Sequence, residues 1–168
     1  MPEPAIVAVI GCGWAGRRHA DAFKRAGAVV RWCVDLDRSR AVTLADAMPG
    51  AIPDTDYRRA LADHEVTAVS ICLPHHLHST ASCEAAAAGK HVLCEKPLAD
   101  TLPNADRMIE AAATAGVILM VAENQRFSPI LNRVGELLRD GAIGRPALIQ
   151  MHRECYLSRS FLEERRWF

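Results

Sequence analysis

The 168-residue sequence lacks an excess of charge of either sign, and it lacks a long hydrophobic run. Twenty basic side chains balance 20 acidic ones, so the chain has no net positive field of the kind that binds nucleic acid or anionic membranes. The apolar stretches without a charge, residues 4–16, 66–74 and 116–122, fall short of the ~18–20 apolar residues that span a bilayer. We therefore expect a soluble protein with no nucleic-acid or membrane partner.

The sequence also lacks paired cysteine motifs and a leader-like N-terminus. None of the six cysteines forms a C-x-x-C pair, and several lie in apolar runs, which favours reduced, mostly buried thiols over a disulfide or zinc role. No basic segment precedes the first apolar run, and glycines follow it, unlike a secretory signal peptide. These features predict a cytoplasmic protein.

Short apolar runs alternate with longer segments of helical period, a pattern typical of parallel strands joined by crossover helices. The predicted strands are Ala5–Ile10, Val29–Val34, Ala68–Leu73, His91–Cys94 and Val117–Ala122, with a weak one near Ala51–Ile52. The predicted helices after the first are Ser39–Met48, Thr55–Asp63, Thr80–Ala88, Pro103–Ala115 and Ser128–Arg139. A glycine stands between helix and strand three times, at Gly27, Gly89 and Gly116, where helices commonly end. The fold class predicted is α/β, a doubly wound parallel sheet of the Rossmann type.

The first helix is expected to follow a glycine-rich turn directly. Its inward stripe is predicted to be Ala15, His19, Ala22, Phe23 and Ala26, which recur at helical spacing. The turn reads G-x-G-x-x-G between a strand and a helix, the context in which this pattern indicates dinucleotide binding. Its unpaired backbone N–H groups and the helix dipole would face the pyrophosphate. The cofactor-binding residues predicted here are Gly11, Cys12, Gly13, Trp14, Ala15 and Gly16.

An acidic residue ends the second predicted strand. Asp35 lies 19 positions after Gly16, where a dinucleotide fold places a carboxylate that accepts the adenosine ribose hydroxyls. Since this carboxylate would repel a 2′-phosphate, NAD is predicted over NADP, although Arg38 and Arg40 lie close enough to soften the preference. Asp37 is a rival acid, for which a solvated turn is the favoured interpretation.

Polar residues follow two further predicted strands. Pro74-His-His-Leu-His78 follows one, and Glu95-Lys96-Pro97 follows the next, so both lie at the sheet edge where ligands bind. Lys96 could hold a substrate hydroxyl or assist its deprotonation, or it could form only a surface ion pair with Glu95. The three histidines lack a carboxylate or cysteine partner at ligand spacing, so no metal site is predicted.

Several segments together carry a family resemblance. GCGWAGRRHADAF, PHHLHSTASCEAAAAGKHVLCEKPLA, AENQRF and LLRDGAIGRP, with Asp35 after the first, resemble the nucleotide-binding half of the glucose–fructose oxidoreductase, inositol dehydrogenase and rhizopine-catabolism (Gfo/Idh/MocA) family. The G-K-H-V-x-x-E-K-P stretch is the most specific of these elements. The resemblance implies a reversible hydride transfer between a nicotinamide dinucleotide and a carbinol carbon of a sugar, inositol or related polyol.

The resemblance also implies roles for particular residues. In the family, the lysine that matches Lys96 contacts the reacting hydroxyl, so Lys96 is expected to be catalytic and substrate-binding. The preceding glutamate lines the cofactor site, which assigns Glu95 and Lys96 to cofactor contacts. The family turn Pro-Asn-x-x-His is matched by Pro74 and His78, while His75 replaces the usual asparagine.

The N-x-R-F segment of the family is matched by Asn124, expected at the cofactor, and Arg126, expected at the substrate. Either could equally be a structural cap or an ion-pair partner.

The resemblance finally implies a domain organisation. Residues 1–145 are expected to form the NAD(P)-binding domain, and residues 146–168 to begin a truncated C-terminal α+β substrate and dimerisation domain, with Ala147–Tyr156 as its first strand. The family carries its acid/base histidine in a D-x-x-x-H segment of that domain, and nothing after Tyr156 matches it. We therefore expect weak or absent activity for these residues alone, and a homo-oligomer for the full-length form. A non-catalytic NAD(P)-binding sensor is the alternative, and a methyltransferase would not account for the E-K-P segment.

Overall fold

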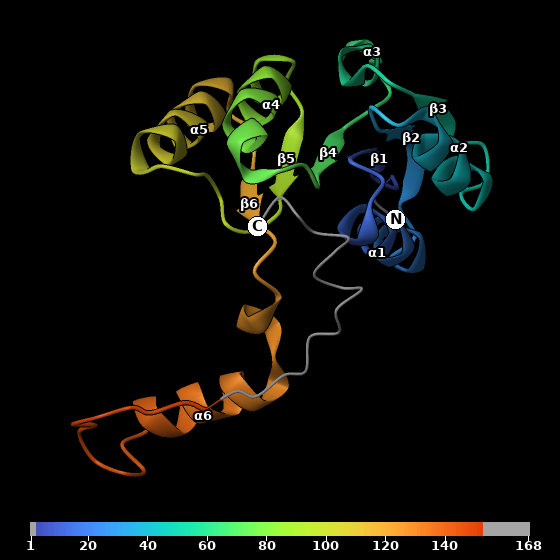
Figure 1. Ribbon diagram of the computed structural model, residues 1–168. Helices are drawn as coiled ribbons and strands as arrows, with labels where there is room; N and C mark the ends of the chain where they lie inside the picture. Colours follow the sequence, from blue (N-terminus) through green and yellow to red (C-terminus); the bar gives the residue numbers. More distant parts are fainter. Residues whose placement is uncertain (1–2, 153–168) are drawn as a thin grey trace. The chain divides into compact units, whose positions relative to one another are not determined.

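Residues 3–152 of the chain are described by a computed structural model (Figure 1). They divide into two compact units, of which the first ends at Ala122 and the second begins at Glu123. The first unit alternates strands and helices from end to end. Its strands are β1 (Ile6–Ile10), β2 (Val29–Val34), β3 (Ile52–Asp54), β4 (Ala68–Ile71), β5 (His91–Cys94) and β6 (Leu119–Val121). Its helices are α1 (Trp14–Arg25), α2 (Arg38–Asp46), α3 (Tyr57–Ala62), α4 (His75–Ala87) and α5 (Leu102–Ala115).

The six strands form one parallel sheet in the order β3-β2-β1-β4-β5-β6. This is the predicted doubly wound Rossmann architecture. The chain runs outward from β1 to β3, returns to the middle, and then runs outward to β6. The order therefore reverses between β1 and β4, and the carboxyl ends of these two strands flank the crevice where open α/β sheets bind ligands.

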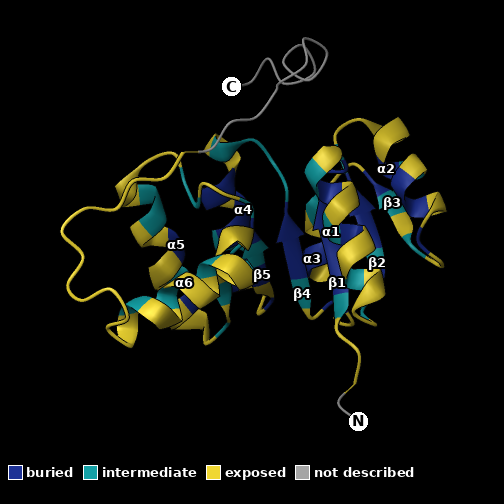
Figure 2. Ribbon diagram, turned by 90° about the horizontal axis from the view of Figure 1, so that it is seen from below, coloured by how far each residue is buried: buried dark blue, intermediate teal, exposed yellow. Residues whose placement is uncertain are grey.

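Each face of the sheet buries its own layer of apolar side chains. In Figure 2 the central strands are largely dark blue, the colour of buried residues. On one face, Val9 of β1 and Cys33 of β2 pack with Ala20 of α1 and Ala41 of α2. On the other face, Ile10 and Ile71 pack in the same layer as residues of α3, α4 and α5. Because both faces are covered near the centre, the central strands read as continuous apolar runs rather than alternating ones.

Three element predictions from the sequence were wrong in detail. Helix α1 buries Gly16 and Ala20, whereas Ala22 and Ala26 are exposed. The close approach of Gly16 to the Gly11 carbonyl sets the rotation of the helix, which periodicity alone could not supply.

The second correction concerns α4, which begins at His75 rather than Thr80. The histidines predicted to lie in a loop therefore occupy the first helical turn. Pro74, in extended conformation, is the N-cap residue, and the residue before a helix is a position where such a conformation fits.

The third correction concerns the last predicted strand, Ala147–Tyr156. Residues 147–152 form no strand, and residues 153–156 lie outside the described part of the chain. A strand needs a neighbour to complete its hydrogen bonds, and none pairs with residues 147–152. The division into domains at residue 145 stays a prediction.

The second unit contains a short 3-10 helix, η1 (Asn124–Phe127), and an α-helix, α6 (Pro129–Arg139). The Ser128 side chain caps α6 by accepting a hydrogen bond from the backbone N–H of Leu131. Neither helix has a buried residue. The apolar side chains of Ile130, Val134 and Leu137 in α6 are all exposed, at the i, i+4, i+7 spacing of one helical stripe.

Candidate functional site

The glycine turn joins β1 to α1 at the carboxyl edge of the sheet. Gly11 has φ +94°, and a Cβ there would overlap the carbonyl of Cys72. A Cβ on Gly16 would overlap the carbonyl oxygen of Gly11. Gly13 differs from both, because a Cβ there would meet no protein atom within 4 Å. Gly11 and Gly16 therefore allow close contacts with neighbouring backbone, whereas Gly13 faces open space.

The amino end of α1 begins at this open position. Gly13 is its N-cap residue, and no side chain caps it, so the first-turn N–H groups are not satisfied by a capping side chain. A helix start of this kind, next to a glycine without a side chain, can receive a phosphate group. The residues present thus fit the pyrophosphate of a dinucleotide.

Asp35 follows β2 and bonds back to the glycine turn. Its Oδ2 accepts a hydrogen bond from the Cys12 backbone N–H at 2.8 Å, and its Oδ1 accepts one from the Asp37 N–H at 2.9 Å. The expectation that the Cys12 N–H is unpaired was therefore wrong, because that group serves to hold Asp35. Each carboxylate oxygen keeps a second lone pair, so Asp35 can still accept from a ribose hydroxyl.

Asp37, the rival acid, has a local role. It is the N-cap residue of α2, and its Oδ1 accepts from the backbone N–H and the hydroxyl of Ser39 at 2.9 and 2.6 Å. Arg40 Nε lies 3.4 Å from Asp37 Oδ2. These bonds hold the pKa of Asp37 below its ordinary value, chiefly through Ser39.

His78 connects the ends of two strands from within α4. Its side chain is fully buried, with Nδ1 3.0 Å from the carbonyl oxygen of Pro97 and Nε2 2.8 Å from that of Leu73. Both ring nitrogens therefore face protein carbonyls, and the residue has no surface for a cofactor to touch. A cofactor contact by His78 would have to be indirect, through the segment that contains Lys96 and Pro97.

His75, the first residue of α4, is less buried and lies edge-on to His78, with ring centroids 5.7 Å apart. Burial lowers the pKa of His75, and the nearby His78 and Lys96 lower it further. A neutral imidazole is thus favoured at this position near pH 7.

Glu95 and Lys96 follow β5 at the same edge. The Lys96 backbone N–H donates to Glu95 Oε2 at 3.0 Å, and the Lys96 side chain is exposed. Within residues 3–152 no ion pair joins the Lys96 ammonium to Glu95. Glu95 Oε1 instead lies 3.2 Å from Nε2 of His19, whose Nδ1 lies 2.8 Å from the Ser70 hydroxyl oxygen.

Sequence reasoning missed this bridge, since it treated His19 as a packed core residue. Ser70 could have indicated the bridge, because its hydroxyl lies within an otherwise apolar strand. A buried polar group needs a hydrogen-bonding partner, so a polar side chain was to be expected beside it. The hydrogen bond from His19, followed by that from the Lys96 N–H, lowers the pKa of Glu95 against the opposing effect of burial. Glu95 is therefore a carboxylate at neutral pH.

Asn124 and Arg126 lie on η1 of the second unit and are exposed. The Glu123 side chain caps this short helix by accepting from the Gln125 N–H. The expected contacts of Asn124 with the cofactor and of Arg126 with the substrate stay predictions.

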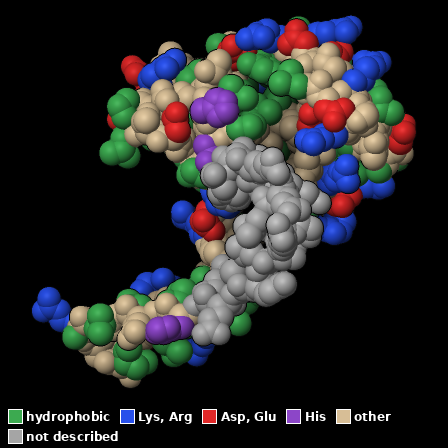
Figure 3. Space-filling model, viewed as in Figure 1, with side chains coloured by type: hydrophobic (Ala, Val, Ile, Leu, Met, Phe, Trp, Pro, Cys, Tyr) green, Lys and Arg blue, Asp and Glu red, His purple; other side chains and the backbone are tan. Residues whose placement is uncertain are grey.

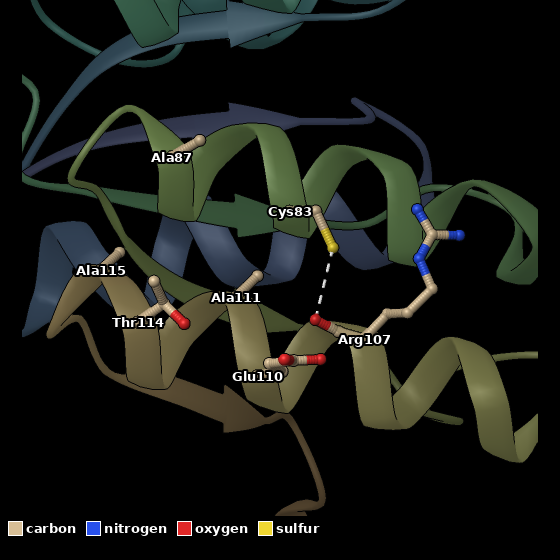
Figure 4. Close-up of a pocket in the computed structure, with 7 residues that line it drawn as sticks. All are labelled: Cys83, Ala87, Arg107, Glu110, Ala111, Thr114 and Ala115. Atoms are coloured by element: carbon tan, nitrogen blue, oxygen red, sulfur yellow. Dashed lines mark hydrogen bonds between the residues drawn. The ribbon is translucent and has the colours of Figure 1, made fainter.

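A groove of about 570 Å³ lies away from this edge, between α4 and α5 (Figure 4). Cys83 and Ala87 line it from α4, and Thr114 and Ala115 are among its lining residues on α5. These positions lie toward the carboxyl ends of both helices, and the strands that follow start there. None of the residues that line the groove belongs to the glycine turn or to the segment with Glu95.

The described residues contain no cluster of three or more His, Cys, Asp or Glu side chains that could hold a metal ion. In residues 3–152 no helix combines the length and the apolar character needed to cross a bilayer. On the visible part of the first unit in Figure 3, basic and acidic side chains are interspersed rather than segregated.

Comparison with known proteins places this architecture in context. Residues 6–123 match the model of an oxidoreductase family with an NAD-binding Rossmann fold. The chain is 32% identical to myo-inositol 2-dehydrogenase of Thermotoga maritima over 146 residues, which is 86% of this chain and 44% of that protein.

Solved structures are similar over the same region. GenD2 from gentamicin A biosynthesis, in complex with NAD, has a TM-score of 0.80 and 34% identity over 84% of this chain and 41% of its own. KijD10, a 3-ketoreductase from Actinomadura kijaniata in complex with NADP, has a TM-score of 0.77 and 32% identity over 84% and 46%. The chain thus spans less than half the length of each of these proteins.

Proposed function

The chain belongs to the Gfo/Idh/MocA oxidoreductase family, and from that premise we propose that it forms the dinucleotide-binding part of a dehydrogenase or reductase. The proposed substrate is a sugar, inositol or related polyol, oxidised or reduced at a carbinol carbon. The observation that carries the proposal is the open space over Gly13 at the start of α1, with Asp35 bonded to the same turn. Little or no turnover is expected from these residues alone, since the family's acid/base histidine belongs to a second domain.

Each residue of the site has a proposed task. The backbone at Gly13 and the first turn of α1 hold the pyrophosphate, while Asp35 accepts from the adenosine ribose. The nicotinamide supplies the hydride acceptor or donor when bound. The exposed Lys96 ammonium holds the substrate hydroxyl and favours loss of its proton, since a nearby positive charge stabilises the oxyanion.

NAD is proposed as the preferred cofactor over NADP, because the Asp35 carboxylate would repel a 2′-phosphate. Arg40, which could counter this effect, is paired with Asp37. Relatives do not decide the matter, as GenD2 was solved with NAD and KijD10 with NADP.

Calorimetric titration with NAD and NADP tests the proposal. We expect NAD to bind more tightly than NADP, and Asp35→Asn to weaken NAD about tenfold and to narrow the difference between the cofactors. Asp37→Asn is the matched control for NAD and should leave NAD affinity unchanged, whereas NADP affinity can rise because the substitution removes the partner of Arg40. The proposed function fails if no binding is found at millimolar NAD, and the cofactor preference fails if NADP binds as tightly.

A second assay addresses Lys96. Reduction of NAD at saturating inositol or sugar should be barely detectable, and Lys96→Met should lower it further without changing NAD affinity. Turnover at ordinary enzyme rates would refute the expectation that this chain is inactive by itself. A loss of NAD binding in Lys96→Met would assign the residue to the cofactor instead.

A further inference from the structure

A chain of hydrogen bonds links three elements of the first unit beneath the proposed cofactor site. His19, in the second turn of α1, reaches Ser70 in the interior of β4 and Glu95 just after β5. Ser70 is fully buried, and the side chains of His19 and Glu95 are 15% and 20% exposed. A hydroxyl buried in an apolar strand is costly without a partner. His19 supplies that partner and also reaches the carboxylate.

The donors and acceptors along this chain place a hydrogen on Nε2 of His19, whereas Nδ1 can either accept from the Ser70 hydroxyl or donate to it. The Glu95 carboxylate can only accept, so Nε2 of His19 carries the hydrogen that faces Oε1. In the neutral ring, Nδ1 then accepts from the Ser70 hydroxyl. Glu95 Oε2 accepts from the Lys96 backbone N–H. The tautomer of His19 with its hydrogen on Nε2 thus satisfies the contacts with both Ser70 and Glu95. Each oxygen of the Glu95 carboxylate accepts one hydrogen bond.

The consequence concerns the neighbouring ammonium group. Glu95 and Lys96 are adjacent, and both side chains are long enough to form a surface ion pair with each other. In this structure the two side chains form no ion pair, and Glu95 points to His19 instead. The carboxylate is therefore held where it leaves the Lys96 ammonium uncommitted.

We propose that His19 is a positioning residue that keeps the Glu95 carboxylate out of an ion pair with the Lys96 ammonium and so keeps that ammonium available to substrate. The significance for substrate rests on the proposed function, but the positioning itself is a property of this chain without any ligand. Loss of the Nε2 donor should release Glu95, which would then pair with the ammonium beside it.

Competitive acetylation of lysine tests this inference directly. The chain has three lysines, of which Lys90 is buried and Lys24 lies in the last turn of α1, where its ammonium donates to the Ala47 carbonyl oxygen. Lys24 is therefore an internal reference in the same molecule. The full chain is treated with a limiting amount of an acetyl ester, and the Lys96-to-Lys24 rate ratio is measured by mass spectrometry. In His19→Asn, whose short amide cannot place a donor at the Nε2 position, we expect this ratio to fall about threefold.

Matched variants separate positioning from a merely structural role. His19→Gln places an amide donor near the original Nε2, so its ratio should remain within about twofold of the original. The double variant His19→Asn with Glu95→Gln should recover the original ratio, because no carboxylate remains to pair with Lys96. Ser70→Ala, which removes the other partner of His19, should leave the ratio unchanged if the Glu95 contact is what matters.

Two results would overturn the inference. One is an unchanged Lys96 ratio in a His19→Asn protein that retains its circular dichroism and cooperative unfolding. The other is a Lys96 ratio that rises threefold or more in the single variant Glu95→Gln, which exceeds the small effect of removing an unpaired neighbouring charge and would mean that the two side chains are already paired. This result is informative even if His19→Asn does not fold. Neither result depends on NAD binding, so failure of this inference is distinct from failure of the proposed function.

Discussion

The two edges of the parallel sheet use charged residues in different ways. At the amino edge, Asp63 accepts from Arg31 Nε at 2.6 Å and from Trp32 Nε1 at 2.8 Å through the same oxygen. The ammonium of Lys90, a buried residue, donates to the carbonyl oxygens of Asp63 and Val66, both at 2.8 Å. The charged groups of this network are therefore directed at partners within the protein.

At the carboxyl edge, the polar groups retain capacity for further contacts. Gly13 faces open space, Lys96 is exposed, and Asp35 has only part of its accepting capacity used. Groups that are satisfied internally stabilise the fold, whereas groups with spare capacity can bind something else. Substitutions at the amino edge should thus change stability, and those at the carboxyl edge should change binding, with Gly16 an exception.

The largest effect is expected at Gly16. An alanine there would overlap the Gly11 carbonyl oxygen, so α1 would have to move away from the glycine turn. We expect Gly16→Ala to lower the free energy of unfolding by about 3 kcal/mol or more and to abolish NAD binding. Urea unfolding followed by circular dichroism measures the first effect, and calorimetry the second.

Gly13→Ala is the matched control in the same turn. Because its Cβ would meet no protein atom within 4 Å, stability should change by less than about 1 kcal/mol, while NAD binding should weaken strongly. Equal losses of stability in the two variants would contradict the distinction between the packing and the ligand-facing glycine.

The next largest effect is expected at Lys90. Lys90→Met keeps much of the side-chain volume but leaves the carbonyl oxygens of Asp63 and Val66 without their donor. The free energy of unfolding should fall by about 2–3 kcal/mol, with NAD affinity within twofold of the original. A change in NAD affinity without loss of stability would break the comparison between the two edges.

The acid dependence of stability should report on Asp63. Its bonds to Arg31, and then to Trp32, lower the pKa of this carboxyl to about 2. A lowered pKa in the folded state means that the stabilisation is present above about pH 4 and is lost as the pH falls toward 2. In Asp63→Asn, stability at pH 7 should be lower and should decline less steeply between pH 4 and 2. Urea titrations at pH 7, 4, 3 and 2.5 measure this; parallel curves would contradict it.

The smallest effect is expected at Asp37. Removing the N-cap of α2 with Asp37→Ala should lower Tm by less than about 4 °C and leave NAD affinity unchanged. Thermal unfolding and calorimetry together distinguish it from Asp35, two positions away. Weaker NAD binding in Asp37→Ala would mean that the rival acid also contacts the cofactor.

Much of the first unit was predictable because its signals are local. The strands β1, β2 and β5 begin and end within one residue of their predicted bounds, since apolar runs between glycines leave little ambiguity. Gly27, Gly89 and Gly116 all have positive φ, as expected of residues that end helices. The weakly predicted strand near Ala51 is β3, an edge strand of three residues, too short to show a period.

The site itself was predictable only in part. The sequence order of strands brings the residues after β1, β2, β4 and β5 to one edge, so the meeting of Asp35 and the glycine turn could be expected. The bridge from His19 to Glu95 joins residues 76 positions apart, and no local pattern encodes such a pair. The start of α4 at His75 likewise depends on long-range contacts, because His78 is held by the carbonyl oxygen of Pro97.

The sequence by itself determined the fold class, the glycine turn and the identity of the polar residues at the carboxyl edge. The hydrophobic period, the glycines that end helices and the alternation of strands and helices are all local features of the sequence. Together they predict a parallel sheet. Only the tertiary structure decided which of those polar groups hold one another and which remain free to bind. That distinction depends on distances between separate strands and helices, as when His19 of α1 reaches the Glu95 carboxylate after β5.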